Sequence, residues 1–140
     1  KIKHKMLLNL FRDIMNYFGR YRLIKDKTGE PYLERFYIFL KDRENFPFNI
    51  FLHRFLKSDP DGLHDHPWNY RTFILSGGYY EELSDNKLHW RQPLSYRFSK
   101  AETFHRIQLK KDKKCWTIFI PGIRRKEWGF IEEYEKWLTE

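Results

Sequence analysis

The sequence has a single cysteine, Cys115, among its 140 residues. One cysteine cannot form an internal disulfide, a four-cysteine zinc site or a Cys-x-x-Cys redox pair. Long apolar runs are missing as well: the longest cover residues 73–75 and 118–120, whereas a membrane-spanning helix needs about 20 residues. These absences exclude a disulfide scaffold and an integral membrane helix. Together with the lack of a visible signal peptide, they predict a protein of the reducing cytoplasm.

Internal repeats, low-complexity segments and Pro/Gly/Ser-rich linkers are also missing, so the chain is expected to form one domain. Neither a Gly-x-Gly-x-x-Gly loop nor a Walker-type loop is present, which excludes nucleotide binding by those two routes. Acidic residues are few relative to basic ones, 19 against 27, which gives a net charge of +8. The basic residues are spread along the chain apart from residues 20–22 and 110–114, and no known nucleic-acid-binding motif appears. We therefore expect no nucleic-acid partner and assign most lysines to the solvated surface.

The first segment has the spacing of an amphipathic helix. Between residues 7 and 18 apolar side chains recur every three or four positions, and Gly19 stands where a helix end is expected. We expect this helix, within residues 1–19, to pack its apolar face on the rest of the domain or on a second subunit. A homodimer is therefore a reasonable expectation.

After Gly19 the hydrophobic period changes from that of a helix to two. Short predicted strands alternate with turn-forming residues; they cover residues 20–25, 32–40, 48–55, 70–75, 79–83, 88–91, 95–98, 103–109 and 115–121. Many short strands without intervening helices indicate an all-β, antiparallel domain over residues 20–131, either a sandwich or a jelly-roll barrel. A short helix is expected in residues 132–140.

Histidines provide the clearest chemical signal in the sequence. His64 and His66 are two residues apart, so on a strand both imidazoles project from the same face, whereas Asp65 points to the other face. His105 lies in a later predicted strand and supplies a third imidazole. Three histidines on one side of a metal leave coordination positions open for other ligands, so the pattern predicts a divalent metal site.

The spacing around these histidines resembles the cupin superfamily. His64-x-His66, Tyr70 and Gly77 match the first cupin motif, in which Tyr70 takes the usual place of a glutamate, and His105 matches the lone histidine of the second motif. More narrowly, the His-Asp-His-Pro-Trp sequence is similar to that of small, functionally uncharacterised cupin proteins of bacteria and phages. The resemblance extends over about residues 20–131 and implies a jelly-roll barrel with a metal near its mouth.

Loss of the motif glutamate leaves a neutral ligand set of His64, His66 and His105. The resemblance associates such a set with Fe(II), as in thiol dioxygenases and diketone-cleaving cupins; Zn, Ni and Mn are the alternatives. A metal charge of +2 without a carboxylate ligand favours an anionic, bidentate substrate, either a small molecule or a group carried by a peptide.

Further side chains are candidates for roles around the metal. Tyr70 and His53 are the candidate catalytic residues. His53, Glu81 or Glu82 is alternatively a fourth ligand, and His53 also fits a role in orienting another ligand. The candidate substrate-binding residues combine one aromatic ring with guanidinium groups that recognise carboxylate or phosphate: Trp68, Arg54, Arg71, Arg124 and Arg125.

The residues leave three functions open. The first is an oxygenase that uses the three-histidine site. The second is an oxygen-independent isomerase or epimerase of a sugar or sugar nucleotide, in which His66 or His105 is the base and Tyr70 the acid. The third is a cupin that binds a ligand without catalysis.

Overall fold

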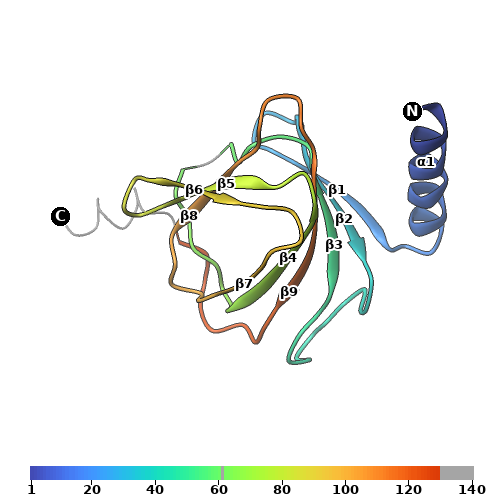
Figure 1. The fold of residues 1–140 in the computed structure, drawn as a ribbon. Helices are drawn as coiled ribbons and strands as arrows, with labels where there is room; N and C mark the ends of the chain where they lie inside the picture. Colours follow the sequence, from blue (N-terminus) through green and yellow to red (C-terminus); the bar gives the residue numbers. More distant parts are fainter. Residues whose placement is uncertain (61, 130–140) are drawn as a thin grey trace.

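The computed structural model describes residues 1–60 and 62–129 (Figure 1). In this part of the chain helix α1, Ile2–Tyr17, is followed by nine strands: β1 Tyr21–Lys25, β2 Pro31–Tyr37, β3 Phe51–Phe55, β4 Tyr70–Ser76, β5 Tyr79–Leu83, β6 Leu88–Arg91, β7 Tyr96–Ser99, β8 His105–Gln108 and β9 Cys115–Pro121. Each strand predicted from the period of two is found, with ends shifted by up to three residues. The helix expected in residues 132–140 lies outside the described residues.

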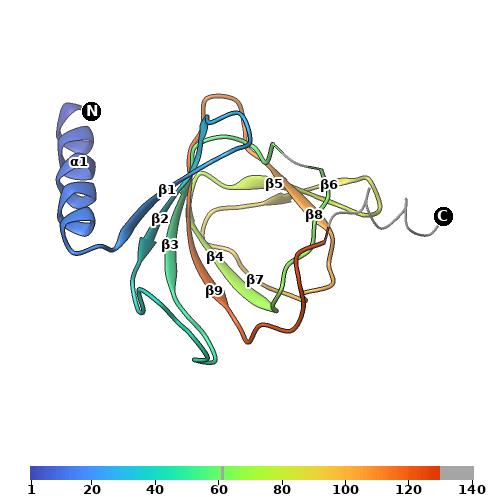
Figure 2. The ribbon, with the colours of Figure 1, turned by 180° about the vertical axis from the view of Figure 1, so that it is seen from behind.

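The strands form two antiparallel sheets. The larger sheet has the order β1-β2-β3-β9-β4-β7, and the smaller has the order β6-β5-β8. The two ribbon views show the smaller sheet lying opposite the larger one, with α1 outside both and beside β1 (Figures 1 and 2). All strand pairings are antiparallel, which confirms an all-β domain preceded by one helix.

Side-chain alternation turns one face of each sheet toward the other. The buried apolar cluster between them draws on both sheets: Leu33, Phe55, Ile74, Tyr79, Ile107 and Cys115. Burial raises the pKa of the Cys115 thiol to about 11, so this cysteine stays protonated at neutral pH and packs as a small apolar side chain.

Helix α1 is attached to the outer face of the larger sheet by few contacts. The rings of Phe11 and Phe36 are 4.7 Å apart, and Nε of Arg12 donates to Glu34 at 2.7 Å. Much of the apolar surface of the helix stays exposed: Ile2, Met6, Leu7, Leu10 and Ile14. Packing on the domain therefore accounts for one side of the helix only, and the homodimer stays a prediction. No helix in the described part of the chain is long and apolar enough to cross a membrane.

Candidate metal centre

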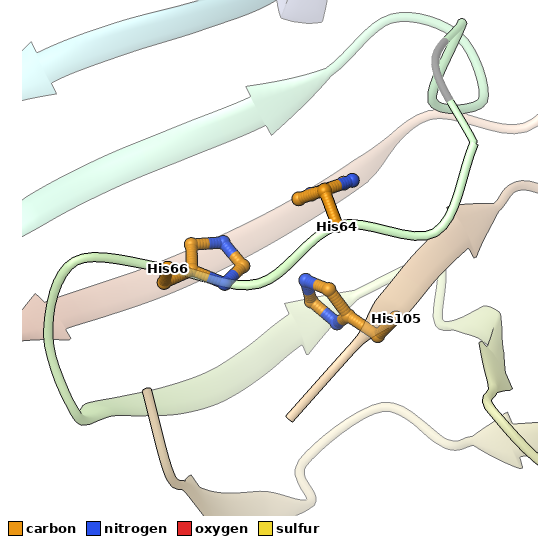
Figure 3. Close-up of side chains that lie close together, drawn as sticks. All are labelled: His64, His66 and His105. Carbon is orange, nitrogen blue, oxygen red and sulfur yellow. The ribbon is translucent and has the colours of Figure 1, made fainter. Parts of the chain in front are cut away.

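Three histidines from two separate segments meet in the space between the sheets. His64 and His66 lie on the extended segment between β3 and β4, and His105 is the first residue of β8 (Figure 3). Backbone hydrogen bonds run both ways between His64 and His105, with N···O distances of 3.0 and 2.8 Å, and the amide of His66 donates to Ala101. His64 is thus held by an isolated β-bridge to His105 of β8. The sequence suggested a regular strand at this place instead.

The side chains of these three residues point toward one another (Figure 3). Their ligand nitrogens all lie within 4.8 Å of one another. The structure therefore brings together the three ligands that the sequence predicts, from positions about 40 residues apart in the chain.

Hydrogen bonds engage Nδ1 of two of the three imidazoles. Nδ1 of His64 lies 3.1 Å from the carbonyl of Gly62, and Nδ1 of His105 lies 2.7 Å from Oε2 of Glu81. Since a carbonyl and a carboxylate only accept, these Nδ1 atoms carry the protons, and Nε2 is the atom that could coordinate a metal. Nε2 of His64 lies 4.0 Å from Oδ2 of Asp59, and Nε2 of His105 lies 3.5 Å from the hydroxyl of Tyr70.

His66 differs from the other two because its Nδ1 is buried and has no hydrogen-bond partner among residues 1–60 and 62–129. Burial lowers the pKa of His66 well below its ordinary value, and the neighbouring imidazoles lower it further. A neutral imidazole with an unpaired nitrogen is the form that coordinates metals. The three residues therefore fit a divalent metal ion.

Glu81 stands behind His105 and is a positioning residue. Burial by itself raises the pKa of this carboxyl, but the hydrogen bond with His105 and the charges of Arg97 and Arg91 outweigh it and bring the pKa to about 2. Nε of Arg91 lies 2.9 Å from Oε1, and Nε of Arg97 lies 3.3 Å from it. Because both oxygens are engaged, Glu81 orients a ligand, and the fourth-ligand alternative has no support in this geometry.

Replacing Glu81 by glutamine is expected to lower metal affinity about tenfold, at the low end of the range of about 10–100 for partners of ligands, because glutamine still accepts from Nδ1 but carries no charge. Competition with a chromogenic chelator measures the affinity. Glu82→Gln, at the next position of β5 and outside the cavity lining, is the matched control. Equal affinities for the two variants would contradict the orienting role of Glu81.

A cavity of about 390 Å³ adjoins the three histidines, a volume typical of small-molecule sites. Its lining includes aromatic rings close to His66: Tyr70 at 4.6 Å, Trp128 at 4.8 Å and Trp68 at 5.5 Å between ring centroids. The hydroxyl of Tyr70 lies 3.4 Å from Nδ1 of His105, and burial together with the charge of Glu81 raises the pKa of Tyr70. Trp68 and Tyr70 therefore lie where the sequence hypotheses need them, and Tyr70 stays protonated near neutral pH.

The segment that carries Trp128 is fixed over the histidines by Asp65. The backbone amide of Asp65 donates to Gly129, and its side chain accepts from the Gly129 amide at 2.7 Å and from Nζ of Lys126 at 2.5 Å. Asp65 thus points away from the ligands on either side of it, as expected. Trp128, which was not among the site residues predicted from the sequence, reaches the site through this long-range contact.

None of the four predicted arginines lines the cavity. Arg54 bonds Glu34 at 3.0 Å on the face of the larger sheet that carries α1, and Arg71 donates to the hydroxyl of Tyr96 at 2.8 Å. Alternation explains both positions, because the strand neighbours His53 and Thr72 occupy the inner face. Arg54 and Arg71 therefore face away from the site, and the prediction that they bind substrate there is wrong.

The two arginines of the later turn also point elsewhere. Arg124 pairs with Glu127 at 2.7 Å, and Arg125 pairs with Glu102 at 3.1 Å; both arginines are exposed. The expected clamp by Arg124 and Arg125 is therefore not formed.

Two arginines that the sequence interpretation missed line the cavity instead, Arg35 on β2 and Arg97 on β7. His53 lies beside Arg35, is 3% exposed and is not part of the three-histidine cluster. The sequence showed only that Arg35 lies in a predicted strand. It did not show that Arg35 faces His53, because strand pairing decides which residues lie opposite each other.

No protein-family model matches the chain, and no curated protein matches it. Solved structures do. The chain is similar to a cupin-2 domain from Rhodospirillum rubrum with a TM-score of 0.62 and 10% identity, covering 86% of this chain and 81% of that one. It is also similar to the polyketide cyclase RemF from Streptomyces resistomycificus, with a TM-score of 0.60 and 12% identity over 77% of this chain and 79% of that one.

A third similar structure is that of Fe(II) HppE, with a TM-score of 0.58 and 14% identity over 72% of this chain. The chain covers 56% of the HppE chain, so it spans little more than half of that protein. At these identities the likeness shows the fold. The chain has the cupin fold, and the resemblance to the cupin superfamily is confirmed at that level.

Proposed function

We propose that this cupin-fold chain is a mononuclear metal enzyme of the non-haem Fe(II) oxygenase type, acting on a small or peptide-borne anionic substrate. The observation that carries the proposal is the set of three histidine ligands beside a cavity of about 390 Å³. Glu81 bonds the back of His105, so the ligand set itself is neutral. An ion of charge +2 on neutral ligands attracts an anionic group, and a substrate that supplies one completes the site. The two facing sheets are, in this proposal, the halves of a jelly-roll barrel.

When bound, iron supplies open coordination positions and redox chemistry. The chain supplies the rest. Glu81 fixes the ring of His105, and the rings of Trp68 and Trp128 pack against that of His66. Tyr70 holds a proton on its hydroxyl near His105, where it can donate to a polar group of the substrate.

Iron is the favoured metal because imidazole ligands suit it and a site of three histidines leaves positions open. Zinc, nickel and manganese remain alternatives, since imidazole also binds them. The likeness to Fe(II) HppE supports iron by analogy of fold alone.

A second candidate function is an oxygen-independent isomerase or epimerase. The short distance between Tyr70 and His105 favours it, because the hydroxyl lies 3.5 Å from Nε2, the imidazole nitrogen without a proton, and the two groups can act as acid and base on one substrate. A ligand-binding protein without catalysis is the third candidate, and it predicts the same metal or ligand affinity with no turnover.

Metal analysis tests the proposal directly. Protein purified without a His-tag and reconstituted with Fe(II) under anaerobic conditions is expected to hold about one ion per chain, because the described histidine ligands form one cluster. Removal of the ion by a chelator should lower the melting temperature, since a ligand at 100 times its Kd stabilises a protein by about 2.7 kcal/mol.

Oxygen uptake then separates the candidate functions. The iron-loaded protein should consume oxygen when supplied with a suitable anionic substrate, and turnover that continues unchanged without oxygen would favour the isomerase. Protein that binds neither iron nor zinc would contradict both metal-dependent candidates.

A further inference from the structure

A row of polar side chains crosses the inner face of the larger sheet. Arg35 on β2 pairs with His53 on β3, and His53 pairs with Thr117 on β9, so the three residues are direct cross-strand neighbours. All three line the cavity that adjoins the histidines. Directly opposite residues in an antiparallel sheet lie about 5 Å apart, close enough for the three side chains to contact one small group.

Arg35 differs from Arg54 and Arg97 because it lacks an acidic partner among the described residues. Arg54 pairs with Glu34 and Arg97 with Glu81, whereas Arg35 forms no ion pair with any residue that the structure describes. Burial lowers the pKa of the Arg35 guanidinium, yet arginine keeps its charge at neutral pH. Arg35 is partly buried; a partly desolvated cation without a counter-charge is costly, and an anionic ligand would lower that cost.

A guanidinium has five N–H donors, and Arg35, which lines the cavity, uses one of them on His53. Its Nε donates to Nε2 of His53 at 3.1 Å, and its guanidinium lies 4.4 Å from the centroid of the Phe51 ring. Tyr37 is its other polar neighbour. Because Nε2 of the neutral His53 accepts this bond, the proton of that imidazole is on Nδ1, which makes Nδ1–H a second donor.

Thr117 gives an independent sign that a ligand belongs here. Thr117 is 1% exposed and lines the cavity, and its Oγ1 has no hydrogen-bond partner in the part of the chain that the structure describes. A buried hydroxyl without a partner costs free energy, so native structures almost always satisfy it with protein, water or ligand.

From these contacts we infer that Arg35, His53 and Thr117 form the binding site for a carboxylate group of the substrate, at a distance from the metal ligands. The guanidinium contributes charge and N–H donors, His53 positions the guanidinium and adds Nδ1–H, and Thr117 adds a hydroxyl. This inference rests on the proposed function for the metal end of the cavity, and it assigns the anion to different arginines from those that the sequence suggested.

One aromatic ring spans the interval between the carboxylate site and the metal ligands. The ring of Phe119 stacks on that of His53 at 5.2 Å and lies 6.4 Å from that of His66. The substrate is therefore expected to carry its carboxylate at one end and its metal-binding group at the other, with an apolar stretch beside Phe119.

Calorimetric titration with succinate tests the inference, with the uncharged succinamide as the matched probe. Succinate should bind both the metal-loaded and the metal-free protein more tightly than succinamide does. Arg35→Gln should weaken succinate binding at least tenfold, since a guanidinium–carboxylate pair is among the stronger hydrogen-bonded contacts. Arg71→Gln, on the outer face of the same sheet, should leave it unchanged.

Thr117→Val is a second test of the carboxylate site, chosen because the variant should fold normally. It removes one hydroxyl at nearly constant volume, so we expect several-fold weaker succinate binding without loss of stability, because no described residue bonds that hydroxyl. Iron content of each variant reports the metal end separately.

The outcomes distinguish the two proposals. Equal succinate affinity in Arg35→Gln and the wild-type protein, or no succinate binding by a wild-type protein that holds iron, would overturn the carboxylate site alone. Arg35-dependent succinate binding by a protein that never holds metal would support the carboxylate site and overturn the proposed function.

Discussion

Replacing His66 by leucine is expected to lower the affinity for divalent metal by more than about 100-fold, because even partners of ligands contribute about 10–100-fold. His66 supplies one of three ligands, and its Nδ1 has no other partner in the described part of the protein. Leucine approximates the volume of the ring and removes a buried unpaired nitrogen, so the metal-free variant should be as stable as the metal-free wild type. Isothermal titration with Fe(II) or Zn(II), together with melting curves, measures both quantities.

His89→Leu is the control for this substitution. His89 lies on β6, is partly exposed and pairs with Asp85 at 3.1 Å, away from the cavity. It should leave metal affinity unchanged and preserve the rise in melting temperature that metal produces in the wild type. Retention of wild-type metal affinity by His66→Leu would show that the three-histidine cluster is not the metal site.

Gly77→Ala is expected to destabilise the fold by more than about 4 kcal/mol, a size that single substitutions reach only through severe steric or burial defects. Gly77 joins β4 to β5 at a φ of +90°, where an L-residue is strained. A Cβ at this position would lie 2.2 Å from the carbonyl oxygen of Lys114 and 3.0 Å from Cα of Cys115. Since both obstacles are backbone atoms at the start of β9, they cannot rotate away.

Gly29→Ala separates the clash from the backbone strain. Gly29 has a φ of +87°, nearly the same as that of Gly77, but a Cβ there meets nothing within 4 Å. Its alanine variant should therefore lose only about 1–2 kcal/mol, the cost of a left-handed alanine. Urea denaturation of both variants measures the difference; similar losses would mean that the close approach of β9 to Gly77 contributes nothing.

Local sequence patterns were sufficient to predict the helix and the strands and to single out candidate metal ligands. Strands show a period of two and α1 a period near 3.6, both set by which side of the chain meets the core, so their existence followed from hydropathy alone. The same holds for His64 and His66, whose spacing places them together whatever the rest of the chain does. The prediction of an antiparallel all-β domain with the cupin fold, drawn from these patterns and the motif, is confirmed.

Groups around the metal depended on pairings between distant strands. Glu81 reaches His105 because β5 pairs with β8, with Leu83 opposite His105, so the two side chains are diagonal neighbours on one face. In the sequence Glu81 and Glu82 were equivalent candidates, since either parity of the strand was compatible with the pattern. The register between β5 and β8 places Glu81, and not Glu82, beside His105.

The arginines show most clearly the difference between what the sequence pattern predicts and what strand pairing decides. The sequence showed that guanidinium groups occur within predicted strands, but a shift of one residue moves a side chain to the opposite face, and alternation alone does not say which face is inner. Arg54 lies next to His53 and faces outward, whereas Arg35 is paired with His53 and faces the cavity. The sequence by itself determined the fold class, through short-range periodicity, and indicated the three histidines, through their spacing and the motif that it resembles. Only the tertiary structure decided which charges surround the three histidines, because that depends on the register between strands that are far apart in the chain.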